Sequence, residues 1–402
     1  MWVNGRDWVD GSGHWTKAWV YDGYQFANAY QSTTVVELTV AANITLLNSN
    51  HSMPNKQLMI IPQANTNRTI YTQNASCLIT NYKWLKIEKN GSGRITFNGS
   101  GLGQTGDCGL LCARGGDLAM VGVNFAYSSS SRWMVHAESG NVWMDQCNFT
   151  QVFNGVGVIA TATGSRTLSV TNSSFNDNGS PRHNDAIHVN NHQGSYQTTI
   201  QGNTIQGFDV PVRIQVTASG NNNISTATNN IRNNTMIGLK RAGLANIYLS
   251  NYRGAVPRSR IVVNTSGNNI SGSAIGIFNY GCKLTSSGDT ITGCWTGIQN
   301  GDRNNPSNTS DVYLNGGTRI ASCSASQNGG GIWNLGYLNI SNATIEGNHA
   351  SSGGGIQNVS GGNGGGNVVI TGGTIRNNSA TYGGGIATTS TVTTSGANYT
   401  GN

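Results

Sequence analysis

Single aliphatic residues recur along the second half of the chain, each beside glycines or a short polar segment. Ile332, Ile356 and Ile386 each follow three consecutive glycines. Two more short apolar runs come after each of them, and the later run lies around Ile345, Ile375 or Tyr399. Three short apolar runs in every repeat predict three short β-strands per repeat.

Both positions of this pattern continue towards the N-terminus, mostly at spacings of 21 to 30 residues. The series expected in the first strand is Ile159, Ile187, Ile214, Ile247, Ile277, Ile298, Ile332, Ile356 and Ile386. The series expected in the third strand is Phe125, Phe149, Phe175, Ile205, Ile231, Ile270, Ile291, Ile320, Ile345, Ile375 and Tyr399. The long step from Ile231 to Ile270 predicts an insertion at about residues 235–262.

Such a repeat predicts an all-β fold, a single-stranded right-handed parallel β-helix with three short strands per coil. One coil cannot bury its aliphatic residue alone, but stacked coils align these residues into columns. Crossovers between parallel strands are right-handed by strong preference. We expect residues 35–402 to form this β-helix. Residues 1–34 would supply an aromatic segment and a capping helix around Tyr21–Tyr30, with Phe26 and Tyr30 on one face.

The composition agrees with a narrow core and many turns. The chain has 56 glycines and 53 asparagines among 402 residues, while only 10% is charged and 36% is hydrophobic. The glycines lack the three-residue period of collagen, and residues that favour helices are too few for a bundle. No apolar run reaches the length of a membrane span. The sequence contains no CxxC pair, a usual spacing of zinc ligands, so we expect no metal and no cofactor.

The net charge of +7 comes from scattered basic residues. Their densest stretch includes Lys240, Arg241 and Arg253, with Tyr248 and Tyr252 between them. A nucleic-acid groove mixes such residues, but a solvated loop is the simpler interpretation, and we expect no nucleic-acid partner. Another reading makes these tyrosines the carbohydrate-binding site of a monomeric adhesin.

Sequons for N-glycosylation number 19, about twice the number that chance would give for this composition. Glycans require surface turns in a secreted chain, so the excess predicts an extracellular or cell-surface glycoprotein. The alternative is that a repeat rich in Asn and Thr produces sequons by construction. The acceptors are Asn43, Asn50, Asn67, Asn74, Asn90, Asn98, Asn148, Asn172, Asn178, Asn223, Asn233, Asn264, Asn269, Asn308, Asn339, Asn342, Asn358, Asn377 and Asn398.

Two disulfides are expected among the seven cysteines. Cys294 and Cys323 each follow their column isoleucine by three residues, so adjacent coils would place them within bridging distance. Cys108 and Cys112 lie on one loop and can also pair.

The C-terminal repeats resemble those of bacterial polymorphic outer-membrane proteins and related surface adhesins. Their short motifs combine a Gly-Gly-x-Ile strand start with a later Asn after an apolar residue. Ile345-Glu346-Gly347-Asn348 and Ile375-Arg376-Asn377-Asn378 match the second element, and the match covers about residues 328–402. The resemblance implies a right-handed β-helix and specifies function poorly.

β-helix enzymes that cleave or epimerise acidic polysaccharides also resemble this architecture, and they need two or three carboxylates together, or carboxylates with Ca²⁺ and a basic residue. Here the candidates are His183, Asp185 and His188, and no second carboxylate is in obvious register with Asp185. The plainer interpretation is a turn aspartate that caps backbone amides beside solvated histidines.

We therefore expect a non-enzymatic, extracellular, glycosylated subunit of a surface fibre or filament, with adhesion as a further role. The last coil ends without a polar cap, which predicts head-to-tail self-association. The alternative is a polysaccharide-degrading or -modifying enzyme, namely a lyase, glycoside hydrolase, depolymerase or epimerase. A carbohydrate ligand fits either hypothesis.

Overall fold

The computed structural model consists of two compact units, Met1–Thr161 with Arg166–Ile187 (unit 1) and Ala162–Ser165 with His188–Asn402 (unit 2). These bounds differ from the expected division at residue 34. The residues that the structure describes are 17–47, 51–52, 56–73, 79–101, 109–127, 133–177, 184–217, 226–239, 241, 244–251, 257–302, 310–360 and 366–402.

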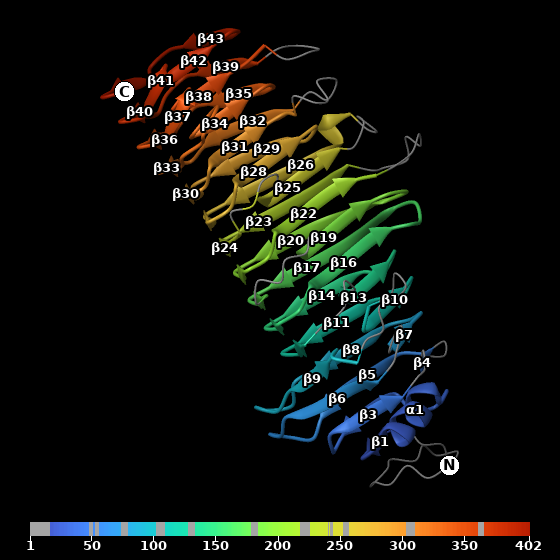
Figure 1. Cartoon of the computed structure of the whole chain (residues 1–402). Coiled ribbons are helices and arrows are strands. Elements are labelled where there is room, and N and C mark those ends of the chain that lie inside the picture. The colour runs from blue at the N-terminus through green and yellow to red at the C-terminus, as the bar shows by residue number, and fades with distance from the viewer. Residues whose placement is uncertain are drawn as a thin grey trace. The chain divides into compact units, whose positions relative to one another are not determined.

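Both units are built from parallel strands that stack in chain order, which confirms the predicted parallel β-helix (Figure 1). Each coil contributes one strand to each of three sheets, which we call sheets 1, 2 and 3 in the order in which the chain visits them. Since neighbouring strands come from successive coils, equivalent side chains lie one strand spacing apart.

Each coil of unit 1 begins with a strand of sheet 1. These strands are β1 (Lys17–Val20), β2 (Glu37–Val40), β5 (Leu58–Pro62), β8 (Leu85–Glu88), β11 (Leu118–Val121), β14 (Val142–Asp145) and β17 (Ser165–Thr171). Its sheet 2 holds β3 (Ile44–Leu47), β6 (Arg68–Gln73), β9 (Ile95–Asn98), β12 (Asn124–Ala126), β15 (Asn148–Thr150) and β18 (Ser174–Asn176). Its sheet 3 holds β4 (His51–Ser52), β7 (Ile79–Asn81), β10 (Leu111–Arg114), β13 (Trp133–Glu138) and β16 (Asn154–Ala160). Strand β19 (Asp185–Asn191) contains the boundary between the units.

Unit 2 repeats the arrangement. Its sheet 1 holds β20 (Ser195–Gln201), β23 (Ala227–Arg232), β26 (Ile261–Ser266), β29 (Lys283–Ser287), β32 (Asp311–Asn315), β35 (Tyr337–Ile340), β39 (Asn367–Ile370) and β43 (Thr391–Thr394). Its sheet 2 holds β21 (Thr204–Gln206), β24 (Thr235–Ile237), β27 (Asn269–Ser271), β30 (Thr290–Thr292), β33 (Thr318–Ala321), β36 (Ala343–Glu346), β40 (Thr374–Arg376) and β44 (Asn398–Thr400). Its sheet 3 holds β22 (Val210–Val216), β25 (Ala245–Asn251), β28 (Ile275–Tyr280), β31 (Thr296–Asn300), β34 (Ile332–Asn334), β38 (Ile356–Asn358) and β42 (Ile386–Thr388). The short 3₁₀ helix η2 (Arg258–Arg260) precedes β26.

The first-strand series forms a real column in sheet 3 of unit 2, where the paired residues are Ile247, Ile277, Ile298, Ile332, Ile356 and Ile386. Two predicted members were wrong. Ile214 pairs with Leu249, so Val212 is the residue aligned with Ile247. Ile159 pairs with Glu138 and is only half-buried. Because residues two apart share a face of a strand, the apolar pattern alone did not fix the register.

The third-strand series lies in sheet 2. In unit 1 the rings of Phe97, Phe125, Phe149 and Phe175 stack, with successive centroids 5.6, 4.6 and 4.4 Å apart. In unit 2 the aligned residues are Ile205, Met236, Ile270, Ile291, Ile320, Ile345, Ile375 and Tyr399.

Ile231 was wrongly assigned to this column. It belongs to β23 and pairs with Ile200 in sheet 1, and the residue in the sheet 2 column is Met236. The predicted insertion at 235–262 therefore contains two regular strands, β24 and β25. Only the segments that connect these strands remain as an insertion.

Asparagine ladders run beside the apolar columns. In unit 2, the backbone N–H of Cys323 donates to Oδ1 of Asn348, that of Asn348 to Asn378 and that of Asn378 to Asn402, at 3.0 to 3.1 Å. A second ladder joins Asn203, Asn234, Asn268 and Asp289, and a third joins Asn279, Asn300, Asn334 and Asn358. Each amide satisfies turn groups that water cannot reach, so many of the asparagines are structural.

The predicted helix is α1 (Gly23–Gln31), which packs beside β1 and β3 in Figure 1. The Asp22 side chain accepts from the Gln25 N–H at 2.8 Å and caps its N-terminus. Phe26 and Tyr30 are buried, with ring centroids 5.8 Å apart, so the helix covers the apolar side of the first coils. No described helix is long and apolar enough to cross a membrane.

Candidate functional site

The predicted acidic candidate lies at the start of β19. Asp185 is 8% exposed, and its backbone N–H donates to Oδ1 of Asn154 at 2.9 Å. Asn184 donates to the carboxylate of Asp177, a second buried acid that sequence reasoning missed. Asn184, the residue before Asp185 in the chain, is thus hydrogen-bonded to the Asp177 carboxylate.

The two histidine candidates are described only in part. His188 lies further along β19 and is half-buried. His183 falls outside the described residues. The described part of the chain contains no cluster of three or more His, Cys, Asp or Glu residues arranged to hold a metal ion.

The expected Cys294–Cys323 bridge was wrong, although the register behind it was right. Ile291 pairs with Ile320, and the Ser324 N–H donates to the Cys294 carbonyl at 2.9 Å. Both sulfurs are thiols, and each donates to the carbonyl two residues earlier, Thr292 or Ala321. Cys112 is a buried thiol, and Cys108 lies outside the described residues.

The sequon acceptors have unequal surroundings. Asn358 is fully buried in the third ladder, where its amide donates to the Gly366 carbonyl and the Thr388 hydroxyl at 3.1 Å. It cannot carry a glycan in the folded chain. The exposed acceptors are Asn43, Asn67, Asn172, Asn233, Asn269, Asn342, Asn377 and Asn398. The acceptors outside the described residues are Asn50, Asn74, Asn178, Asn223 and Asn308.

A concavity of unit 2 lies where the coil length changes. The connection from sheet 2 to sheet 3 covers seven positions from Ile291 to Ile298 but twelve from Ile320 to Ile332. The added residues include Ser324–Asn328, which we call the wall. Its ends bridge to the next coil through Ser324 with His349 and Asn328 with Ser352. Successive coils there add a fourth side, the two-stranded sheet of β37 (His349–Ser352) and β41 (Ser379–Tyr382).

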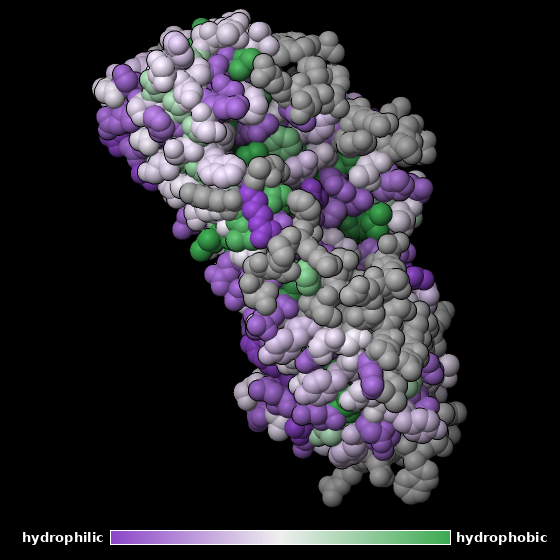
Figure 2. All heavy atoms as spheres, in the orientation of Figure 1, coloured by the Kyte–Doolittle hydropathy of each residue, from purple (hydrophilic) through white to green (hydrophobic). Residues whose placement is uncertain are grey.

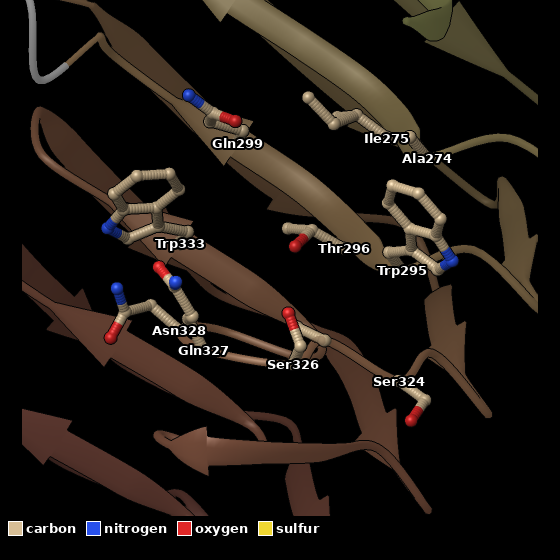
Figure 3. Close-up of a pocket in the computed structure, with 11 residues that line it drawn as sticks. Ala274, Ile275, Trp295, Thr296, Gln299, Ser324, Ser326, Gln327, Asn328 and Trp333 are labelled. Carbon is tan, nitrogen blue, oxygen red and sulfur yellow. The ribbon is translucent and has the colours of Figure 1, made fainter. Parts of the chain in front are cut away.

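A cleft lies where the shorter coils meet the wall. Its volume is about 640 Å³, within the range of small-molecule sites. Figure 3 shows Trp295 and Trp333 at opposite ends, Thr296 between them and the wall along one side. Trp295 is 41% exposed, so its side chain is accessible to solvent and is not buried in the core. The lining is Ala274, Ile275, Trp295, Thr296, Gln299, Ser324, Ala325, Ser326, Gln327, Asn328 and Trp333.

Strand register places the cleft at the end of an aromatic row on the outer face of sheet 3. Arg213, Tyr248, Phe278, Gln299 and Trp333 are successive partners in this row. The Arg213 guanidinium lies 4.5 Å from the Tyr248 ring centroid, and the Tyr248 and Phe278 centroids are 4.9 Å apart. Tyr248, a predicted binding residue, is therefore packed into the row, while Tyr252 lies outside the described residues.

The cleft is electrically neutral, because none of its lining residues is titratable. The groups with perturbed pKa values lie elsewhere. Burial raises the pKa of Asp289, and hydrogen bonds from Arg376 and Arg319 hold the pKa of Glu346 below its usual range. Burial also lowers the pKa of Lys56 to about 8. Among the coloured residues, the face in Figure 2 is mostly hydrophilic, with separate apolar spots.

Comparison with known proteins gives no family. No protein-family model matches the sequence, and no curated protein matches it. A solved structure with similarity to the chain is a variant of the catalytic domain of a GH87 α-1,3-glucanase in complex with tetrasaccharides, with TM-score 0.32 and 11% identity, covering 98% of this chain and 67% of that one. The same catalytic domain in complex with nigerose gives TM-score 0.29 and 12% identity over the same shares.

Proposed function

We propose that this β-helix binds carbohydrate, with the neutral cleft beside the wall as its binding site. The observation that carries the proposal is the joint presence of Trp295 and Trp333 with amide and hydroxyl side chains in one cleft. Adhesion to a glycan and action on a polysaccharide both require such a site.

The chemistry of the lining suits a sugar ring. A pyranose presents a face of C–H groups and a rim of hydroxyls. The electron-rich faces of Trp295 and Trp333 suit the C–H face. Gln299, Gln327 and Asn328 offer both donors and acceptors, as hydroxyls require. A single exposed tryptophan on a surface is common, but two in one uncharged cleft favour a ligand.

A glycan array tests the proposal. It should carry neutral glucan, mannan, xylan and galactan oligomers together with oligogalacturonate and alginate oligomers. Hits would then be measured by isothermal titration calorimetry. We expect binding that Trp295→Ala weakens about tenfold or more, since aromatic anchors dominate such sites. Trp143→Ala is the matched control, because Trp143 is 39% exposed on β14 of unit 1. Absence of binding to any glycan, or equal loss in both variants, would refute the proposal.

Polysaccharide cleavage is the second candidate function, and Asp177 and Asp185 favour it. Glycoside hydrolysis needs a pair of carboxylates as general acid and base, and Asp177 is hydrogen-bonded to Asn184, which precedes Asp185 in the chain. We expect that, if the chain cleaves a glycan, Asp185→Asn and Asp177→Asn each reduce the release of reducing ends by at least about a hundredfold. Cleavage unaffected by both substitutions would exclude this segment as the active site.

The extracellular location and the N-glycans are part of the proposal and are supported by the exposed sequon acceptors, such as Asn342 and Asn377. The intact mass of the protein from its native source, before and after deglycosylation, tests both. A mass that equals the sequence mass before treatment would contradict them.

A fibre subunit is the alternative role. In the last described coil, Ile386 and Val392 are half-buried and Tyr399 is 42% exposed, although they stack on buried Ile356, Val368 and Ile375. Light scattering over a hundredfold range of concentration tests this role, and a constant monomer mass would contradict it.

A further inference from the structure

The charge of the cleft, its dimensions and the wall beside it indicate which kind of carbohydrate it binds. The side chain that adjoins the wall in the next coil is that of His349, which forms a bridge with Ser324. Its ring is hydrogen-bonded to the Ser379 hydroxyl at 2.9 Å. Because the lining contains no titratable residue, no cation in it compensates a carboxylate or sulfate that loses its water. The cleft therefore favours an uncharged sugar.

The two indoles fix the length of ligand that the cleft accepts. Trp295 immediately precedes β31, while Trp333 pairs with Gln299 near the end of that strand. Their positions along the strand differ by four residues, or about 13 Å at the usual rise per residue. Thr296 lies between them and Gln299 lies beside Trp333, as Figure 3 shows. A di- or trisaccharide spans this distance.

The wall fixes the direction in which that ligand lies. Its backbone is tied to the coil behind it, with Ala325 N–H donating to the His349 carbonyl at 2.9 Å and Ser352 N–H to the Gln327 carbonyl at 3.0 Å. The Ser351 hydroxyl also donates to the Ser326 carbonyl at 2.8 Å. A sugar chain running across the strands would meet this hydrogen-bonded barrier. A chain lying along β31 would not.

We propose that the cleft holds a di- or trisaccharide segment of an uncharged glycan, lying along β31 against the wall, with its end rings stacked on Trp295 and Trp333. This inference rests on the proposed carbohydrate-binding function. The two indoles act as the end plates, and the amides of Gln299, Gln327 and Asn328 bind the hydroxyls between them.

The first test is a length series. The neutral glycan that binds best would be supplied from mono- to hexasaccharide, beside oligogalacturonates of the same lengths, to the whole chain in a calorimeter. Affinity should rise up to the di- or trisaccharide and then change less than about twofold. A steady rise to the hexasaccharide, or comparable binding of the oligogalacturonates, overturns the inference. Binding of some glycan in that case leaves the broader function standing, whereas binding of none rejects the function itself.

The second test uses the two end plates separately. Trp295→Ala and Trp333→Ala should each weaken trisaccharide binding about tenfold or more, while Trp143→Ala leaves it unchanged. A monosaccharide occupies one plate, so its binding should respond to only one of the two substitutions. Trp333→Phe keeps an aromatic face and guards against misfolding, and it should recover most of the affinity lost in Trp333→Ala. Trisaccharide binding that is unchanged by either Trp295→Ala or Trp333→Ala overturns the inference.

Discussion

Gln299 and Trp333 pair in register across β31 and β34, and both side chains line the cleft. One coil earlier, the equivalent residue Phe278 is 8% exposed because it packs with Tyr248 and Tyr280. In the same outward-facing row, Phe278 is thus covered by neighbouring side chains, whereas Gln299 lines the cleft. The change coincides with the lengthened connection that contains the wall, so both the longer coil and the end of the aromatic packing distinguish the open position.

The ladders should be a large source of stability. Asn348 accepts from the Cys323 N–H and donates to the Ile320 carbonyl and to Asn378 at 3.0 to 3.1 Å. Asn348→Ala should lower the free energy of unfolding by about 2–3 kcal/mol, because it leaves buried groups without partners. Urea denaturation measures this loss.

Asn342→Ala is the control, since Asn342 is exposed in the same coil. It should change stability by less than about 0.5 kcal/mol. Equal effects of the two substitutions would mean that the ladder contributes nothing beyond the backbone.

Asn358 should be empty of glycan even where its neighbours are occupied. Its side-chain nitrogen is committed to the ladder, so an attached sugar would break bonds to Gly366 and Thr388. Glycopeptide mapping of the folded fraction from a glycosylating host measures occupancy. Asn342 and Asn377 are the exposed comparators. Substantial glycan on Asn358 of folded protein would contradict its position in the structure.

The lowered pKa of Lys56 predicts that its contribution to the free energy of unfolding rises with pH in the alkaline range. Its ammonium group donates to the Val35 and Ala29 carbonyls at 2.6 and 3.2 Å, and burial lowers its pKa from 10.5 to about 8. Between these two values the unfolded chain binds more protons than the folded chain, so this residue's contribution to stability increases with pH.

The unfolding free energy of the wild type minus that of Lys56→Met should therefore grow from pH 8 to pH 10, because all other titrations cancel in the difference. Urea titrations at several pH values give this difference. A difference that stays flat or falls would show that the lysine keeps its ordinary pKa.

Asp289 predicts the opposite sign on the acid side. Burial raises the pKa of its carboxyl above 3.8, despite hydrogen bonds from Ser286, Thr265 and Asn268. The folded chain then binds the proton more readily, so the stability contribution of Asp289 falls as the pH rises from 3.8 through the folded pKa.

Asp289→Asn keeps an acceptor for Asn268 without the charge. It should match or exceed the wild type in stability at pH 7, and this advantage should shrink towards pH 4 in thermal melts. A variant that is least stable, relative to the wild type, at neutral pH would contradict the raised pKa.

The repeat itself was predictable because its columns recur. Ile332, Ile356 and Ile386 follow the same glycines, and strand pairing confirms them. The errors at Ile214 and Ile231 have one cause. An apolar residue stands near both the correct and the incorrect position, and nothing in a single sequence ranks Met236 above Ile231.

The ladders carried a signal that was not used. Asn348 and Asn378 follow their column isoleucines by three residues, as Cys323 does, and all three lie in one ladder. The offset that suggested a disulfide marks a polar turn position instead. The cleft had a weaker signal, the extra residues between Ile320 and Ile332. Only the folded coils bring Trp295 and Trp333 to opposite ends of one site.

A crystal structure of the whole chain with the best-binding neutral trisaccharide tests the central claim most directly. The account predicts sugar density along β31, with one ring on Trp295, another on Trp333 and hydroxyls at Gln299 and Asn328. A trisaccharide bound elsewhere, at Asp185 for example, with the cleft beside the wall unoccupied, would contradict it.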